Sequence, residues 1–274
     1  MHLPKNFGRI YANTEKAGEP LNRKEDYIAV FDSGVGGISV LRQLRKLMPG
    51  ERYLYFGDSG NAPYGSRPTA EVRNFAMQAG EHLMEQGIKA LVVACNTATA
   101  AAIDTLRQAY PNLIIVGIEP ALKLAANRFP GGCVGVLATP VTLREEKFQH
   151  LVETSSNHCR VIRLPAPGLS DLVEQGKANS PESQALLRPL LTPWIGKMDA
   201  LVLGCTHYPF ASETISKIMG SGTVLPDGGE GTAKETRRRL TEAGLLHDGP
   251  GLIRWENSSD SPEITALSLK LLDA

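Results

Sequence analysis

Short apolar runs recur along the chain, separated by stretches that have apolar residues at helical spacing. The runs are rich in Val, Ile and Leu and alternate little with polar residues, a pattern typical of strands buried on both faces of a sheet. The predicted strands span residues 27–31, 52–56, 90–94, 113–116, 134–137, 160–164, 200–203 and 223–225.

The stretches between these runs predict helices. One has apolar residues at helical spacing between Val40 and Leu47, and another spans residues 70–86. Each ends at a glycine or a Pro-Gly pair, as helices commonly do. Regular alternation of strands and helices predicts an α/β fold with mainly parallel sheets flanked by helices.

The chain also contains an internal repeat. Residues 90–97 read ALVVACNT and residues 200–207 read ALVLGCTH, 110 positions later. Upstream of each, residues 28–34 resemble residues 134–140 at an offset of 106. Two similar offsets in the same order predict two α/β domains of similar topology. Chance similarity between buried strands is the alternative.

A length of 274 residues accommodates two domains. We expect a first α/β domain over residues 27–121, to which residues 230–274 return, and a second over residues 122–229. The active site is expected in the cleft between the two domains. Residues 1–26 are polar and lack periodicity, so they predict a flexible N-terminal extension.

Charge is balanced, with 29 Lys plus Arg against 29 Asp plus Glu. Without a strong basic field, the chain is not expected to bind nucleic acid or an anionic membrane. The longest basic run, residues 237–239, lies between Glu235 and Glu242. We interpret it as the solvated face of a helix.

The four cysteines are too widely spaced for a disulfide scaffold, and no C-x-x-C pair predicts a zinc site. Neither a secretory signal nor an apolar stretch of about 18 residues is found, so we expect a cytoplasmic protein. The chain also lacks a nucleotide-binding fingerprint, and no lysine stands in a clear Schiff-base context. No cofactor and no metal are therefore predicted.

Cys95 and Cys205 are the strongest candidates for chemistry. Each follows a predicted buried strand and precedes a helical stretch. The carboxyl ends of strands border the ligand sites of α/β sheets, and a nearby helix N-terminus favours a thiolate. For either cysteine alone, a buried structural role is the favoured interpretation. Two in equivalent contexts favour a function.

Three further residues border the same predicted sheet edge. Asp32, in the glycine-containing stretch 31–37, could orient a ligand ammonium or adjust a thiol pKa. Tyr64 offers a hydroxyl on a loop, and His207 could relay a proton beside Cys205. A tight turn, an ordinary loop tyrosine and a capping histidine are the alternatives.

Two opposed thiols suit the inversion of an α-carbon. The reaction removes a weakly acidic proton on one face and delivers one on the other. One thiolate takes the proton while the opposite thiol donates, and the roles exchange in the reverse direction. Donors and exclusion of water must stabilise the carbanionic transition state.

On these residues the sequence resembles the glutamate racemase family over nearly all of residues 27–274. The motifs that carry the resemblance are residues 31–37 (FDSGVGG), 63–65 (PYG), 93–97 (VACNT) and 203–209 (LGCTHYP). In that family the two cysteines form the acid/base pair, which implies Cys95 and Cys205 here. The catalytic auxiliaries map onto Asp32, His207 and Glu174. The substrate-contacting positions map onto Asp32, Ser33, Tyr64, Gly65, Asn96, Thr97, Thr206 and His207.

The resemblance further implies a cofactor-independent, cytoplasmic enzyme that interconverts L- and D-glutamate and supplies D-glutamate for peptidoglycan. It implies a homodimer, and an N-terminal extension that takes part in regulation by a cell-wall precursor. Three rivals remain open at this point. They are racemisation of aspartate or another α-substituted acid, a dithiol redox or metal-binding protein, and a non-catalytic binding protein that keeps the cleft.

Overall fold

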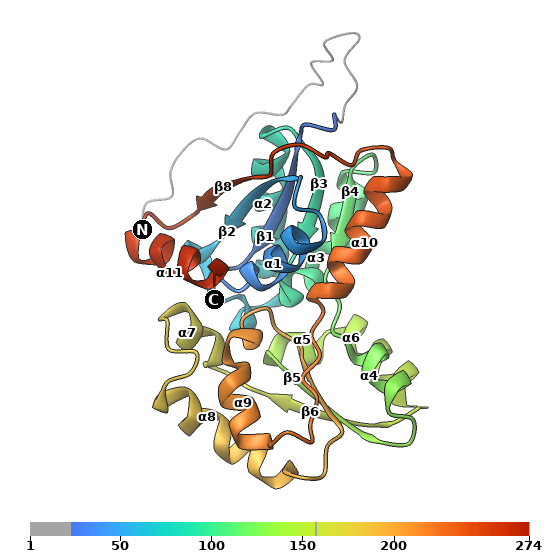
Figure 1. The fold of residues 1–274 in the computed structure, drawn as a ribbon, viewed down its shortest axis with the longest axis vertical. Coiled ribbons are helices and arrows are strands. Elements are labelled where there is room, and N and C mark those ends of the chain that lie inside the picture. Colours follow the sequence, from blue (N-terminus) through green and yellow to red (C-terminus); the bar gives the residue numbers. More distant parts are fainter. Residues whose placement is uncertain (1–22, 157, 274) are drawn as a thin grey trace.

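Two separate parallel sheets organise the chain in the computed structural model, which describes residues 23–156 and 158–273 (Figure 1). The first sheet has the strand order β4-β3-β1-β2-β8, and the second has the order β6-β5-β7. The strands are β1 (Tyr27–Asp32), β2 (Arg52–Gly57), β3 (Ile88–Val93), β4 (Ile114–Gly117), β5 (Cys133–Ala138), β6 (Arg160–Pro165), β7 (Ala200–Leu203) and β8 (Leu252–Asn257).

Helices connect the strands and cover both sheets, which confirms the predicted α/β fold with parallel sheets. The α-helices are α1 (Ile38–Leu47), α2 (Thr69–Glu85), α3 (Asn96–Ala109), α4 (Leu122–Arg128), α5 (Pro140–Arg144), α6 (Glu146–Ser156), α7 (Leu169–Glu174), α8 (Pro181–Leu191), α9 (Ser212–Met219), α10 (Gly229–Glu242) and α11 (Pro262–Asp273). The described residues also form the short 3₁₀ helices η1 (Ser59–Asn61), η2 (Tyr64–Ser66), η3 (Thr192–Trp194) and η4 (Tyr208–Ala211).

The inner strands of the first sheet are largely apolar because helices bury both of its faces. Phe31 and Leu91 contribute to the core under α2 and α3, whereas their neighbours Val30 and Val92 contribute to the core under α1 and α10. Successive side chains of a strand point to opposite faces, so a strand covered on both sides needs no polar alternation. The second sheet is likewise covered on both faces.

The strand orders of the two sheets agree with the internal repeat. The sequence repeat relates β1 to β5 and β3 to β7. In the structure these strands occupy equivalent positions, because the order β3-β1-β2 in the first sheet matches the order β7-β5-β6 in the second. Cys95 and Cys205 therefore follow topologically equivalent strands. Equivalent strands end at equivalent sheet edges, which is the arrangement that the repeat predicts.

One strand prediction was wrong, and one strand was missed. The run 223–225 forms only isolated bridges, Ala200 with Val224 and Leu203 with Asp227. Pro226 has no N–H with which to continue the ladder. Strand β8 was missed because it lies at the edge of the first sheet, is partly exposed and carries polar residues.

The last part of the chain packs against the first sheet. Strand β8 pairs with β2, while α10 and α11 pack against α1, as the red and blue ribbons of Figure 1 show. Most of the predicted N-terminal extension, residues 1–22, lies outside the described residues. Within the described part of the chain, no helix has both the length and the apolar character needed to cross a bilayer.

Candidate active site

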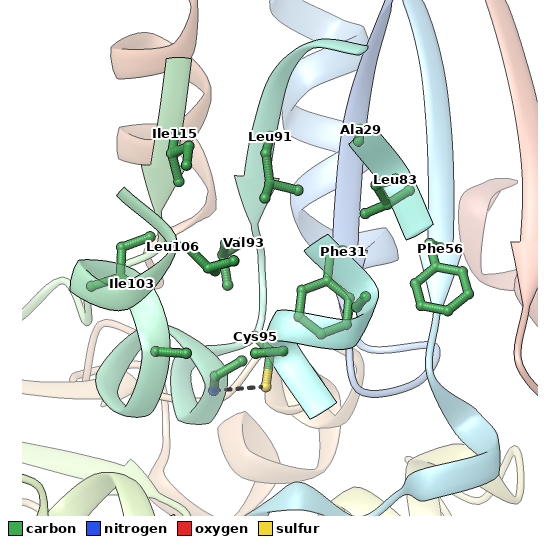
Figure 2. Close-up of a cluster of buried hydrophobic side chains, with 14 of the residues drawn as sticks. Ala29, Phe31, Phe56, Leu83, Leu91, Val93, Cys95, Ile103, Leu106 and Ile115 are labelled. Carbon is green, nitrogen blue, oxygen red and sulfur yellow. Dashed lines mark hydrogen bonds between the residues drawn. The ribbon is translucent and has the colours of Figure 1, made fainter. Parts of the chain in front are cut away.

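Cys95 lies at the carboxyl end of β3, where it caps the N-terminus of α3 (Figure 2). Its Sγ accepts a hydrogen bond from the backbone N–H of Ala98 (3.4 Å), and its S–H donates to Ser33 Oγ (3.6 Å). Burial, with a further contribution from the charge of Asp32, raises the pKa of Cys95 to about 12. The isolated site therefore holds Cys95 as a neutral thiol.

Cys205 lies just beyond the carboxyl end of β7 in the second sheet. Its Sγ is 3.6 Å from Nδ1 of His207, whose Nε2 is 2.6 Å from Oε1 of Glu174. Burial alone lowers the pKa of His207, but hydrogen bonds with Cys205 and Glu174 outweigh burial and raise it well above its usual value. A protonated His207 donates from both ring nitrogens, to a sulfur and to a carboxylate.

The surroundings of Cys205 differ from those expected. A helical stretch was predicted two residues after each cysteine, and α3 begins at Asn96 after Cys95, but Cys205 is followed by the 3₁₀ helix η4 before α9 begins at Ser212. Pro209 in η4 cannot donate a backbone hydrogen bond to the preceding turn. The charge of His207, rather than a helix dipole, is the positive group beside this sulfur.

Asp32 ends β1 and is fully buried. Its carboxylate accepts hydrogen bonds from the hydroxyl of Thr206 (3.0 Å) and from the backbone N–H of Gly34 (3.1 Å). Burial raises the pKa of Asp32, although the charge of His207 and the two hydrogen bonds act against the increase. Asp32 thus links the end of the first sheet to the segment that carries Cys205.

One small cavity, of about 20 Å³, lies where the ends of the two sheets meet. It brings together ten of the residues singled out in the sequence, all except Asp32, which reaches the cavity through Thr206. The ten are Ser33, Tyr64, Gly65, Cys95, Asn96, Thr97, Glu174, Cys205, Thr206 and His207.

Asn96 has an unusual position in this cavity. It is 95% buried, and within the described part of the chain neither its Nδ2 nor its Oδ1 has a hydrogen-bond partner. Leaving a buried amide unpaired costs about 1–3 kcal/mol. A buried polar group without a partner therefore points to a ligand that supplies one.

The structure adds lining residues that the sequence reasoning missed. Thr139 caps α5, and its hydroxyl lies 3.2 Å from that of Thr97. Helix α7, which follows β6 of the second sheet, contributes Ser170 and Asp171. The repeat held a signal for Thr139, because the offset of 106 places it opposite Ser33. No comparable signal marked the residues of α7.

Tyr64 lines the cavity, but its hydroxyl donates to Oδ2 of Asp58 (2.6 Å). Among the described residues there is no group of three or more His, Cys, Asp or Glu side chains arranged to hold a metal ion.

The fold and the cavity define an α/β protein that brings one thiol from each of two parallel sheets to a single site. A family model described as Asp/Glu/Hydantoin racemase matches residues 38–235. The chain belongs to this family, which confirms the predicted class of enzyme, a racemase.

Individual relatives confirm the resemblance seen in the motifs. The glutamate racemase of Clostridium botulinum is 44% identical over 257 residues, which span 93% of this chain and 100% of that protein. The crystal structure of the Francisella tularensis glutamate racemase with D-glutamate matches with a TM-score of 0.80 and 27% identity, over 92% of this chain and 95% of that one. The Escherichia coli enzyme, in complex with L-glutamate and the activator UDP-MurNAc-ala, matches with a TM-score of 0.81 and 30% identity, over 91% and 94%.

Proposed function

We propose that this protein is a cofactor-independent glutamate racemase in which Cys95 and Cys205 exchange protons with the α-carbon. The observation that carries the proposal is that both sulfur-bearing residues line one cavity from the ends of different sheets. Groups from opposing sheets can address opposite faces of one carbon. One sulfur removes the α-proton while the other delivers a proton to the other face.

The two cysteines have different surroundings in this mechanism. Burial holds Cys95 as a thiol, ready to donate. Cys205 faces the ring of His207, which Glu174 holds in place. Cys205 is proposed as the base for the enantiomer whose α-proton faces the second sheet. For the other enantiomer the roles exchange.

Neutral donors bind the substrate carboxylate. No lysine or arginine is among the described residues that line the cavity. Helix α3 spans 14 residues, and the N–H groups of its first turn favour an anion beside the unpaired amide of Asn96. The hydroxyl of Thr97 lies at the same helix end. These donors also stabilise negative charge that develops during proton removal.

Substrate binding requires the two sheets to separate and close again. A cavity of about 20 Å³ has room for about one water molecule, not for an amino acid. Contacts between the halves, such as Thr206 with Asp32 and the Val35 N–H with Glu174, hold the site shut. We propose that glutamate enters an open form and that closure then excludes water from the reacting carbon.

Glutamate is proposed as the substrate because the relatives with bound D- and L-glutamate share the fold over more than nine-tenths of this chain. The product D-glutamate would supply peptidoglycan synthesis, and four free cysteines fit a cytoplasmic site of action. The E. coli relative's activator supports the prediction of regulation by a cell-wall precursor. The homodimer stays a prediction.

Incubation with L-glutamate in heavy water, without added cofactor, tests the proposal. We expect D-glutamate to form with deuterium at the α-carbon, and Cys95→Ser or Cys205→Ser to lower kcat by about 10²–10⁴-fold. Cys159→Ser is the matched control, because Cys159 is also buried and free but lies outside the cavity. Near-normal turnover by Cys95→Ser would end the two-thiol mechanism, and faster turnover of aspartate would change the substrate.

A further inference from the structure

The loop between β2 and α2 forms one wall of the cavity. Residues 62–65 of this loop line the cavity, with Tyr64 buried to 99%. The loop starts at Asp58, which directly follows β2 and is itself 96% buried. Asp58 does not line the cavity, so its buried carboxylate has a different task from those of Asp32 and Glu174.

The carboxylate of Asp58 is hydrogen-bonded to two other residues of the loop. It accepts a hydrogen bond from the hydroxyl of Tyr64 (2.6 Å), and Nδ2 of Asn61 lies 3.0 and 3.1 Å from its two oxygens. Its backbone N–H donates to the carbonyl of Asp32 (2.9 Å). Asp58 therefore links the start of the loop to Tyr64 near its other end and to the end of β1.

Tyr64 is held at both ends of its side chain. Its ring stacks on Phe75 with centroids 5.7 Å apart and meets Phe31 edge-on at 6.4 Å. Burial and the charge of Asp58 raise the pKa of the phenol, so it remains a hydrogen-bond donor at all working pH values. A charge-assisted hydrogen bond is about twice as strong as a neutral one, which favours a carboxylate at position 58.

The wall that this loop forms tolerates little displacement. A Cβ atom at Gly65 would lie 2.8 Å from Cγ2 of Thr139, so the loop already contacts the opposite half of the molecule at van der Waals distance. A displacement of about 1 Å in a substrate-positioning element can cost about 10²-fold in rate. The position of residues 63–65 thus sets the shape of the closed cavity.

We propose that Asp58 is a positioning residue that acts through the hydroxyl of Tyr64 to hold residues 63–65 in the shape that fits the substrate. The proposal rests on the proposed racemase function. Asp58 does not line the cavity, so it acts on the shape of the cavity only through the loop. By fixing the loop, Asp58 gives this side of the cavity a defined shape before the substrate binds.

Two substitutions remove the hydrogen bond from either side, Tyr64→Phe and Asp58→Ala. We expect each to raise KM for glutamate by about tenfold, the loss of roughly one charge-assisted hydrogen bond, with kcat changed less than about threefold. The double variant is expected to be no worse than Asp58→Ala, because both changes break the same contact. Asp58→Asn keeps an acceptor for the phenol and is expected to restore most of the affinity.

Tyr53→Phe is the matched control. Tyr53 is an equally buried tyrosine on β2, and its hydroxyl donates to the carbonyl of Met48 (2.9 Å), outside the cavity. The Tyr53→Phe substitution removes one buried hydrogen bond outside the loop, so KM for glutamate is expected to stay unchanged. An unchanged KM in Tyr64→Phe, an equal rise in Tyr53→Phe, or additive effects in the double variant would overturn the proposal.

Amide hydrogen exchange distinguishes a failure of this proposal from a failure of the racemase assignment. Exchange across residues 58–66 is expected to speed up in Tyr64→Phe and not in Tyr53→Phe, whether or not glutamate is the substrate. If wild-type protein does not racemise glutamate but the loop responds as expected, the positioning role stands and the substrate is wrong. Unchanged exchange in Tyr64→Phe refutes the positioning role.

Discussion

At the scale of single residues, burial and neighbouring charges have opposite effects on the pKa values of the site. Asp32 and His207 are both buried in the same small region, and each has a pKa above its ordinary value. For Asp32 the cause is the loss of solvation, so its ionised form costs folding free energy. The carboxylate is kept for its contacts with Thr206 and Gly34, which link the halves.

Asp32→Asn is therefore expected to raise thermal stability at neutral pH while lowering activity. The pKa of Asp32 in the folded protein is raised above its ordinary value of 3.8, so the protonated side chain contributes full stability only below pH 3.8. This contribution is lost as the pH rises through the folded pKa. The Asn variant escapes this loss, so the difference in Tm should widen from pH 4 to pH 8. Asp104→Asn, at a 73% exposed aspartate, is the control, with no such trend expected. A less stable Asp32→Asn at every pH would contradict the argument.

At the scale of elements, the loop between β1 and α1 depends on close approach. Gly36 lies so close to the ring of His207 that a Cβ atom there would overlap it. The N–H of the preceding residue, Val35, donates to Glu174 (2.7 Å), which also holds His207. The glycines thus allow the first half to pack directly against the histidine–glutamate pair of the second half.

Gly36→Ala is expected to lower kcat/KM by at least about 10²-fold, because the added methyl group keeps the halves from closing to the productive geometry. Circular dichroism should remain that of the folded protein, since the loop can move away in the open form. Gly231→Ala is the matched control, because Gly231 is exposed on α10 with nothing near its Cβ position. There we expect normal activity and about 0.5–1 kcal/mol more stability. Full activity in Gly36→Ala would refute the close approach.

At the scale of the whole molecule, one buried ion pair joins distant parts of the chain. The Nζ of Lys89 lies 2.6 Å from Oε2 of Glu51, and both side chains are fully buried. The same Nζ donates to the carbonyls of Lys24 and Leu245, while Oε1 of Glu51 accepts from the N–H of His247. The beginning, middle and end of the chain meet here, at the end of the first sheet remote from the cysteines.

Lys89→Met is expected to lower the free energy of unfolding by about 3–5 kcal/mol, because it leaves the charge of Glu51 buried and unpaired. Urea denaturation measures the loss. The double variant Lys89→Met/Glu51→Gln should recover part of it. Lys217→Met, which breaks an exposed pair with Glu213, should cost less than about 1 kcal/mol. Equal costs for the buried and exposed pairs would contradict the expectation.

Much of the fold could be predicted from the sequence because its signals are local. Buried parallel strands read as apolar runs, so seven of the eight predicted runs overlap strands β1 to β7. The repeat located Cys95 and Cys205 at equivalent strand ends, and the surrounding motifs supplied most residues of the cavity. Local patterns failed where polarity was mixed, as in edge strand β8.

Tertiary structure decided what depends on contacts between residues far apart in sequence. Asp58 precedes a recognisable motif, yet only the folded loop shows its carboxylate bonded to Tyr64. Nothing local to Lys89 marks it as buried against Glu51, because its two aliphatic neighbours in β3 predict only a strand. The sequence by itself determined which elements form and where the two thiols stand along them. Whether those thiols share one cavity, and which charges are buried around it, was decided by how the two sheets pack, since distance and desolvation exist only between folded parts.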